Sequence, residues 1–266
     1  LQGWRGDRAG GHERRVIGLL LWAAMMLFAW FSGCWKVLLA IFLMMSLHEA
    51  AHCLAAMLVH CPVRRVRIYP FGLCAQIDEI SYVSVGSALF ILAAGPCMHL
   101  LFPFLLQAMA SCSLISVSFA GYLMEINRAM LLFNLLPVVP LDGGRIMQTL
   151  FHLWLPYAKA QRLGVLCSFA ALPVIFLSGC MRDAAGMITL FVLFIQELMQ
   201  HARLMEERMS FYRYRLSHPF LGRRKVHAQH DLYRNRTNYL QEGTQLIDER
   251  TWLKRLFHCR SGQNMI

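Results

Sequence analysis

The amino-acid sequence predicts an all-α polytopic membrane protein with about six transmembrane helices and a small β-hairpin or edge strand after the second span. Apolar residues make up 57% of the 266 positions, and the mean hydropathy is +0.45. These values exceed those of a soluble globular protein. The apolar residues also gather in runs of roughly 20, which is the length a helix needs to cross a bilayer.

The apolar runs divide the chain into spans and short polar connections. In order, we expect spans near residues 16–35, 37–59, 82–110, 114–139, 163–181 and 184–199. A cleaved signal peptide is the alternative for the first run, although that run is longer than a usual signal core. Residues 200–266 are polar and basic, and we expect a partly helical or disordered tail there.

Residues 60–81 interrupt the apolar pattern. Arg64 and Val66 begin an alternation of polar and apolar residues, and Tyr69-Pro70-Phe71-Gly72 breaks it. This pattern is typical of short β-structure. The alternative is an ordinary interfacial loop with basic and aromatic anchors.

Lys and Arg are distributed unevenly between the two sides of the membrane. If six spans start from a cytoplasmic N-terminus, the inside segments hold all but three of the 26 basic residues, the exceptions being Lys36, Arg128 and Arg182. The positive-inside rule therefore predicts that both termini are cytoplasmic. The net charge of +11 is explained in this way, and we expect no nucleic-acid partner.

The second span carries the motif His48-Glu49-Ala50-Ala51-His52. Histidines at positions i and i+4 lie on one face of a helix, so both imidazoles can reach one metal ion, and Glu49 is placed as the base of a zinc hydrolase. A polar cluster that joins helices or a proton relay are the alternatives for ionisable residues inside a bilayer. A third ligand would favour the metal, because catalytic zinc takes three protein ligands.

The fourth span ends in a second informative stretch, Asn134 to Arg145, with the sequence NLLPVVPLDGGR. Two prolines break the helix, and two glycines after Asp142 allow a tight turn and a close backbone approach. A carboxylate on irregular backbone at membrane depth is costly unless something binds it. Asp142 is therefore the predicted third metal ligand, with an Asp-Gly-Gly surface turn as the alternative.

Other polar residues within the spans are predicted to face the helix bundle. The fourth span contains Glu125, Asn127, Arg128 and Asn134, which are too polar to face lipid. In the third span, His99 follows Gly95-Pro96, and a hydrogen-bonded histidine between helices is favoured there over a catalytic role.

Together, HEAAH, AAGP and NLLPVVPLDGG resemble the site-2 protease family of intramembrane zinc metalloproteases, most of all its sporulation members. The resemblance implies one zinc ion held by His48, His52 and Asp142, with Glu49 as the catalytic base. It also implies that five further residues line the active site or present substrate: Asn134, Gly95, Pro96, Tyr69 and Phe71. Residues 16–199 would form the membrane-embedded protease domain, between a cytoplasmic segment at 1–15 and the basic tail at 200–266.

The resemblance further implies a membrane-associated precursor of a sporulation sigma factor as substrate, inhibitory membrane proteins as partners, and a location in the bacterial cytoplasmic membrane or the membrane around the forespore. Many relatives have Asn where this chain has His99, so no catalytic role is carried onto that residue. The sporulation members also end in a nucleotide-sensing CBS domain, and the tail is too short and basic to hold a complete one.

Other functions remain open at this level. Two histidines and a carboxylate also suit Fe(II), as in a non-haem iron oxygenase, although that chemistry gives Glu49 no necessary role. A transporter is the non-enzymatic alternative and would predict inverted repeats. Within the protease class, a general role in cutting anti-sigma factors or membrane remnants is the second candidate.

Overall fold

A computed structural model describes residues 23–24, 27–62, 65–69, 72–76, 82–179, 183–228, 231–243 and 245–263. The chain divides into two compact units. The first comprises Leu1–Glu79 and Phe90–Asn134, and the second comprises Ile80–Leu89 and Leu135–Ile266.

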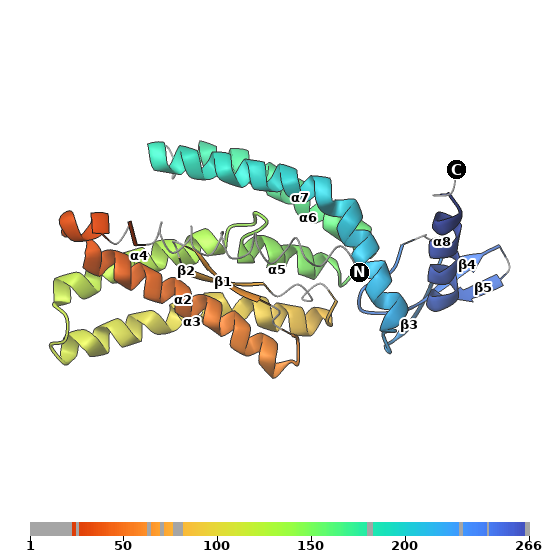
Figure 1. Ribbon diagram of the computed structural model, residues 1–266, viewed down its shortest axis with the longest axis horizontal. Coiled ribbons are helices and arrows are strands. Elements are labelled where there is room, and N and C mark those ends of the chain that lie inside the picture. Colours follow the sequence, from red (N-terminus) through yellow and green to blue (C-terminus); the bar gives the residue numbers. More distant parts are fainter. Residues whose placement is uncertain are drawn as a thin grey trace. The chain divides into compact units, whose positions relative to one another are not determined.

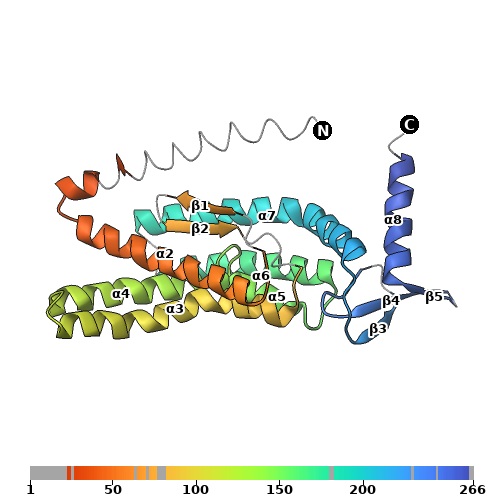
Figure 2. The same cartoon turned by 60° about the horizontal axis from the view of Figure 1, so that its bottom comes forward.

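Three helices form the body of the first unit: α2 (Trp35–Leu58), α4 (Val117–Asn134) and the part of α3 (Val85–Ser111) from Phe90 onward. They run side by side in Figures 1 and 2. Their shared core is apolar, and its buried members are Met44, Phe102, Leu106 and Leu123. Burial of such side chains is the main source of packing free energy between these helices where water is excluded.

A two-stranded antiparallel hairpin, β1 (Arg65–Tyr69) and β2 (Gly72–Gln76), follows α2. Its register pairs Arg65 with Gln76 and Tyr69 with Gly72. The hairpin lies along α2 (Figure 2). The β-structure predicted for this segment is therefore confirmed, and the alternative of an ordinary loop is wrong.

The second unit contains α5 (Asp142–Phe151) and two long helices, α6 (Tyr157–Leu177) and α7 (Ala184–Ser217). α6 and α7 lie side by side (Figure 1), and the rings of Phe169 and Phe194 meet edge to face at 5.9 Å. α7 has 34 residues, which is about 50 Å of helix and longer than a bilayer core of about 30 Å. The predicted sixth span at 184–199 lies within α7, and the helix continues past this apolar segment to Ser217.

The tail beyond α7 is more ordered than the sequence predicted. A three-stranded sheet has the order β3-β4-β5, with β3 (Arg224–His227) parallel and β5 (Gln245–Asp248) antiparallel to β4 (Thr237–Glu242), and α8 (Glu249–Gln263) follows. We call residues 218–263 the tail module. Its apolar core also includes residues from the helices, and its fully or nearly fully buried members are Tyr157, Phe211, Tyr212, Leu232, Leu240, Ile247, Trp252 and Leu253.

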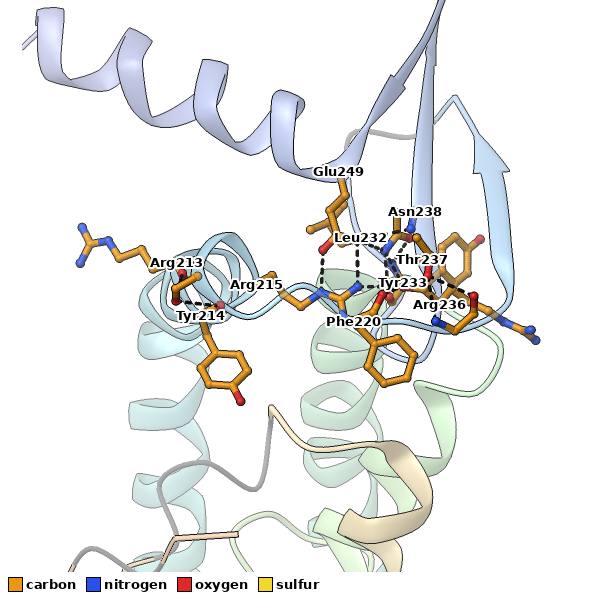
Figure 3. A network of polar contacts seen from close by, with 12 residues as sticks. Arg213, Tyr214, Arg215, Phe220, Leu232, Tyr233, Arg236, Thr237, Asn238 and Glu249 are labelled. Carbon is orange, nitrogen blue, oxygen red and sulfur yellow. Dashed lines mark hydrogen bonds and ion pairs between the residues drawn. The ribbon is translucent and has the colours of Figure 1, made fainter. Parts of the chain in front are cut away.

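A buried ion pair links the end of α7 to the tail module (Figure 3). Arg215 donates from Nε to one Glu249 oxygen at 2.6 Å and from Nη2 to the other at 2.8 Å. Asn238 Nδ2 also donates to Glu249 at 2.9 Å, and Arg215 donates to the Arg236 carbonyl at 2.8 Å. Because each charged group has several hydrogen-bond partners, its desolvation is offset.

Four helices among the described residues are long and apolar enough to cross a membrane: α2, α3, α6 and α7. The prediction of about six spans is too high for this part of the chain. Part of the predicted span at 16–35 (residues 16–22 and 25–26) lies outside the described residues. α4 is not one of the four, because Glu125, Asn127 and Arg128 lower its hydropathy.

The prediction that all polar residues of α4 face the bundle is wrong for two of them. Glu125 and Arg128 are 75% and 72% exposed and form an ion pair of 3.9 Å on the outer face. Asn127 is 3% exposed, as predicted. Residues i and i+3 share a helix face that residue i+2 does not, so one helix can bury Asn127 and expose its two charged neighbours.

Candidate metal centre

Two histidine side chains meet inside the first unit. His48 and His52 lie one turn apart on α2 and are 2% and 6% exposed. Their Nε2 atoms are 3.2 Å apart, and the rings stand edge to face. The helical spacing in the sequence therefore brings both imidazoles to one point, on the buried side of α2.

The neighbouring helix orients His52. Its Nδ1 lies 2.7 Å from the carbonyl oxygen of Ile91 on α3, and a carbonyl can only accept, so Nδ1 carries the hydrogen. In the neutral ring, Nε2 then carries a lone pair and faces His48 Nε2. Metal-binding histidines are commonly held in this way, with the other ring nitrogen donating to a backbone carbonyl.

The distance between the two Nε2 atoms fits a shared zinc ion. With Zn–N bonds of about 2.0–2.1 Å and tetrahedral angles, two imidazole nitrogens on one ion lie about 3.3 Å apart. The observed 3.2 Å is close to that value. A direct N–H···N hydrogen bond has a similar length, so the geometry permits a metal and does not by itself require one.

Gly95 of α3 leaves room for this pair. A Cβ atom on Gly95 would lie 2.3 Å from His52 Nε2 and 2.7 Å from His48 Nε2. Any side chain would therefore occupy the space beside both nitrogens. Pro96 follows within α3, so two of the residues predicted to line the site lie on the helix that faces the histidines.

A second polar pair lies next to His48. The His99 ring centre is 5.0 Å from that of His48, and His99 is 1% exposed. Asn127 of α4 makes two hydrogen bonds to His99: its Oδ1 accepts from His99 Nδ1 at 2.7 Å, and its Nδ2 donates to the His99 carbonyl at 2.9 Å. The predicted hydrogen-bonded histidine between helices is confirmed. Asn127 is a residue of this centre that the sequence marked only as polar.

Asp142, the third predicted ligand, belongs to the second unit, where it is the first residue of α5. The prediction placed it on irregular backbone, and this is wrong, since the loop ends at Leu141, the N-cap. A carboxylate in the first turn of a helix is stabilised in its ionised form by the exposed N–H groups and the helix dipole. The ionised carboxylate is the form that binds a metal.

The two glycines after Asp142 allow the preceding loop to lie across the first turn of α5. A Cβ on Gly143 would be 2.2 Å from the Leu135 carbonyl oxygen, and one on Gly144 would be 2.3 Å from the Val138 carbonyl carbon. Val138 is fully buried. The predicted close backbone approach is therefore present.

Ser168 of α6 binds this loop, a role that was not predicted from the sequence. Its Oγ accepts from the Val139 N–H at 3.0 Å and donates to the Gly164 carbonyl at 3.0 Å. Ser168 is fully buried. A serine inside an apolar span was the available signal, but serine often bonds only to its own helix, so the signal was weak.

The other residues predicted for the site lie on α2, on α4 and in or beside the hairpin. Glu49 is half-buried on α2, and Asn134 is the half-buried last residue of α4. Tyr69 ends β1, and Phe71 lies outside the described residues.

Outside the spans, His152 is a buried polar residue at the end of α5. It is 3% exposed, its ring stacks on Tyr157 at 5.0 Å, and among the described residues Nδ1 has no hydrogen-bond partner. Burial, with a smaller effect from the positive charge of Arg234, lowers the pKa of His152 to about 3. The ring is therefore neutral at physiological pH.

Comparison with known proteins finds similarity over part of the chain. Residues 107–177 match Peptidase family M50. Over 134 residues the chain is 31% identical to Stage IV sporulation protein FB of Bacillus subtilis, which covers 50% of this chain and 46% of that protein. It is 32% identical over 135 residues to the Mycobacterium tuberculosis protein named "Putative zinc metalloprotease Rip3", which covers 47% of this chain and 33% of that protein.

Among solved structures, the chain is similar to a site-2 protease from Methanocaldococcus jannaschii, with a TM-score of 0.46 and 21% identity over 72% of this chain and 88% of that one. The chain spans about half, or less, of the length of the curated relatives it matches.

Proposed function

We propose that this integral membrane protein is an intramembrane zinc metalloprotease of the site-2 type, because residues 107–177 match Peptidase family M50 and four helices among the described residues have the length and composition of membrane spans. It would hydrolyse a peptide bond in a membrane-associated protein. The observation that carries the proposal is the His48–His52 pair, with Nε2 atoms 3.2 Å apart beside a glycine that leaves room for both rings.

The proposed ligand set is His48, His52 and Asp142 for one zinc ion. Two neutral imidazoles and one carboxylate leave a coordination position open for water or substrate, as catalytic zinc requires. A bound zinc ion would polarise the scissile carbonyl and make a water molecule more acidic. We carry Asp142 into this set from its place at the start of α5 and from the resemblance of the motif.

The protein's own residues supply the proton transfers and the orientation. Glu49 would accept the proton of the attacking water and later give it to the leaving amine. The Ile91 carbonyl keeps the hydrogen of His52 on Nδ1, so Nε2 keeps the lone pair that a metal ligand needs. Ser168, through the Val139 N–H, would hold the loop that leads to Asp142.

For the substrate, we propose a membrane-associated precursor of a sporulation sigma factor. The support is the similarity to a protein whose name assigns it to stage IV of sporulation. Inhibitory membrane proteins would then be its partners, and both termini would lie in the cytoplasm. The hairpin after α2, with Tyr69 and Phe71, would present the substrate by strand addition.

The proposal is tested by co-expressing a tagged sigma-factor precursor with the wild-type protein or with Glu49→Gln, which keeps the size of the side chain and removes the base. We expect the wild type to shorten the precursor and the variant to lose this activity by at least about 100-fold. The control is Glu125→Gln, which changes an exposed carboxylate on α4 and should cleave like the wild type.

Zinc measured in the same preparations separates the metal from the base. Glu49→Gln should retain one zinc per chain, whereas His52→Ala should lose it. Equal shortening by the wild type and Glu49→Gln would remove Glu49 from the mechanism. Iron in place of zinc in the purified protein would instead favour the oxygenase.

A further inference from the structure

A pocket of about 290 Å³ lies between the start of α6 and the middle of α7 in the second unit. We call it the α6–α7 pocket. None of its lining residues is among those assigned to the metal centre. Its lining residues are Ala158, Gln161, Arg162, His201, Ala202, Leu204, Met205 and Arg208.

The ionisable side chains that line the α6–α7 pocket are all basic: Arg162, His201 and Arg208. Arg162 and His201 are exposed, and Arg208 is half-buried. Arg208 Nε donates to the Tyr212 hydroxyl at 3.0 Å, which holds its guanidinium at the pocket. Guanidinium groups in a fixed position suit phosphate oxygens.

The nearest carboxylates do not line the pocket and have other partners. Asp231 accepts from the Tyr212 hydroxyl at 2.7 Å and from the Ala158 N–H at 2.9 Å, although it also lies 3.9 Å from Arg208. Glu207 accepts from Gln200. Glu206 lines a different, neighbouring pocket. An anion in the α6–α7 pocket would therefore meet basic groups at its walls.

The pocket lies where both helices change from apolar to polar surface. On α6, the exposed side chains are Lys159 and Arg162 near the start, and they become apolar from Leu166 onward. On α7, which runs antiparallel beside α6 (Figure 1), the exposed side chains are mainly apolar up to Met199 and mainly polar from His201 onward, although Met205 is also exposed. These two transitions from apolar to polar surface lie at the same position along the helix pair, since residues from both regions line the pocket.

An exposed tryptophan marks the same level. Trp154, just before α6, is 69% exposed, and tryptophan is enriched at the boundary between the lipid tails and water. The side chains around the α6–α7 pocket therefore have the composition expected at the depth of lipid headgroups. Leu204 and Met205 in its wall offer apolar contact beside the basic groups.

We propose that the α6–α7 pocket binds the phosphate of an anionic phospholipid headgroup, with the acyl chains along the exposed apolar faces of α6 and α7. Basic pockets between membrane helices are suited to anionic lipids. The continuity of the pocket with an apolar helix surface favours a lipid over a free phosphate ion. A lipid bound there would contact both helices and stabilise the packing of α6 on α7 at the membrane boundary.

The proposal is tested by native mass spectrometry of the full chain in detergent, with dioleoylphosphatidylglycerol or dioleoylphosphatidylcholine added. We expect preferential binding of phosphatidylglycerol, and about fivefold weaker binding for Arg162→Gln, since one basic group near lipid headgroups contributes about that factor. Arg162→Lys should retain most of the binding. The matched control is Lys159→Gln, an exposed basic residue of α6 that does not line the pocket, which should bind like the wild type.

Three outcomes would overturn the proposal. One is equal binding of the two lipids, and another is equal weakening by Arg162→Gln and Lys159→Gln. The third is displacement of the lipid by an equal concentration of inorganic phosphate, which would identify a site for soluble phosphate. The measurement needs no protease activity, so its result is independent of the proposed function.

Discussion

Replacing Gly95 by alanine should abolish metal binding while leaving the helix intact. The added Cβ would lie 2.3 Å from His52 Nε2 and 2.7 Å from His48 Nε2, whereas such atoms settle at about 3.5 Å. The imidazoles would have to move by about 1 Å, and metal–ligand distances tolerate only about 0.2 Å. We expect the affinity for zinc to fall by at least about 100-fold.

Backbone effects would not cause this loss. Alanine favours a helix interior over glycine by about 0.5–1 kcal/mol, so the intrinsic effect of the substitution on α3 is stabilising. The matched control is Gly86→Ala on the same helix, where an added Cβ would meet no atom within 4 Å.

The assay is zinc content by mass spectrometry after equilibration of the purified protein with buffered free zinc, followed by precursor cleavage. Gly86→Ala should match the wild type in both measurements, and Gly95→Ala should fail in both. Stoichiometric zinc in Gly95→Ala at wild-type affinity would refute the metal centre beside Gly95.

Two further predictions concern the second unit. Arg215→Ala should destabilise the tail module by about 3–5 kcal/mol, because it leaves the Glu249 carboxylate buried without its cation, and limited proteolysis should cut the module faster. The pKa of His152 is about 3 in the folded protein and about 6.5 in the unfolded chain. The free energy of unfolding is therefore highest above about pH 6.5 and decreases as the pH falls toward 3, because the unfolded chain binds a proton at His152 that the folded protein does not. Unfolding should therefore become easier by about 2 kcal/mol between pH 7 and pH 5, and His152→Phe should reduce this slope.

Each of these predictions has a control. Arg255→Ala breaks an exposed ion pair of 3.6 Å with Glu242 and should cost no more than about 1 kcal/mol, so equal proteolysis of Arg215→Ala and Arg255→Ala would contradict the importance of burial. For His152, thermal unfolding at several pH values gives the slope. An identical slope in the wild type and His152→Phe would assign the acid sensitivity to other groups.

Much of the fold could be predicted because membrane helices have a local signal. An apolar run of the right length predicts a helix whatever surrounds it, and α2, α3 and α6 fall close to their predicted ranges. The signal failed where helix continuation depends on water and packing. α7 extends to Ser217 because its polar end is stabilised by the tail module, whose core residues are widely separated in sequence.

The candidate site could likewise be predicted only where it depends on local spacing along one helix. The i, i+4 spacing of His48 and His52 was enough to predict that their side chains meet, since 3.6 residues per turn place them on one face. The partners that orient them were not predictable, because Ile91 and Asn127 lie on other helices. The helical period places Asn127 on a different face of α4 from Glu125 and Arg128, but only the packing of the helices decides which face is buried.

The sequence alone therefore determined the membrane class and the helical metal motif, and it predicted short β-structure at residues 60–81, because these features depend on residues that are neighbours along the chain. Only the tertiary structure decided that Gly95 lies against both imidazoles, that Ser168 holds the loop before Asp142, and that Arg215 is buried against Glu249. These contacts join residues 29 or more positions apart, as the Val139–Ser168 and Arg215–Glu249 separations illustrate. They depend on which helix faces pack together, and that choice minimises the free energy of the whole fold rather than of any one segment.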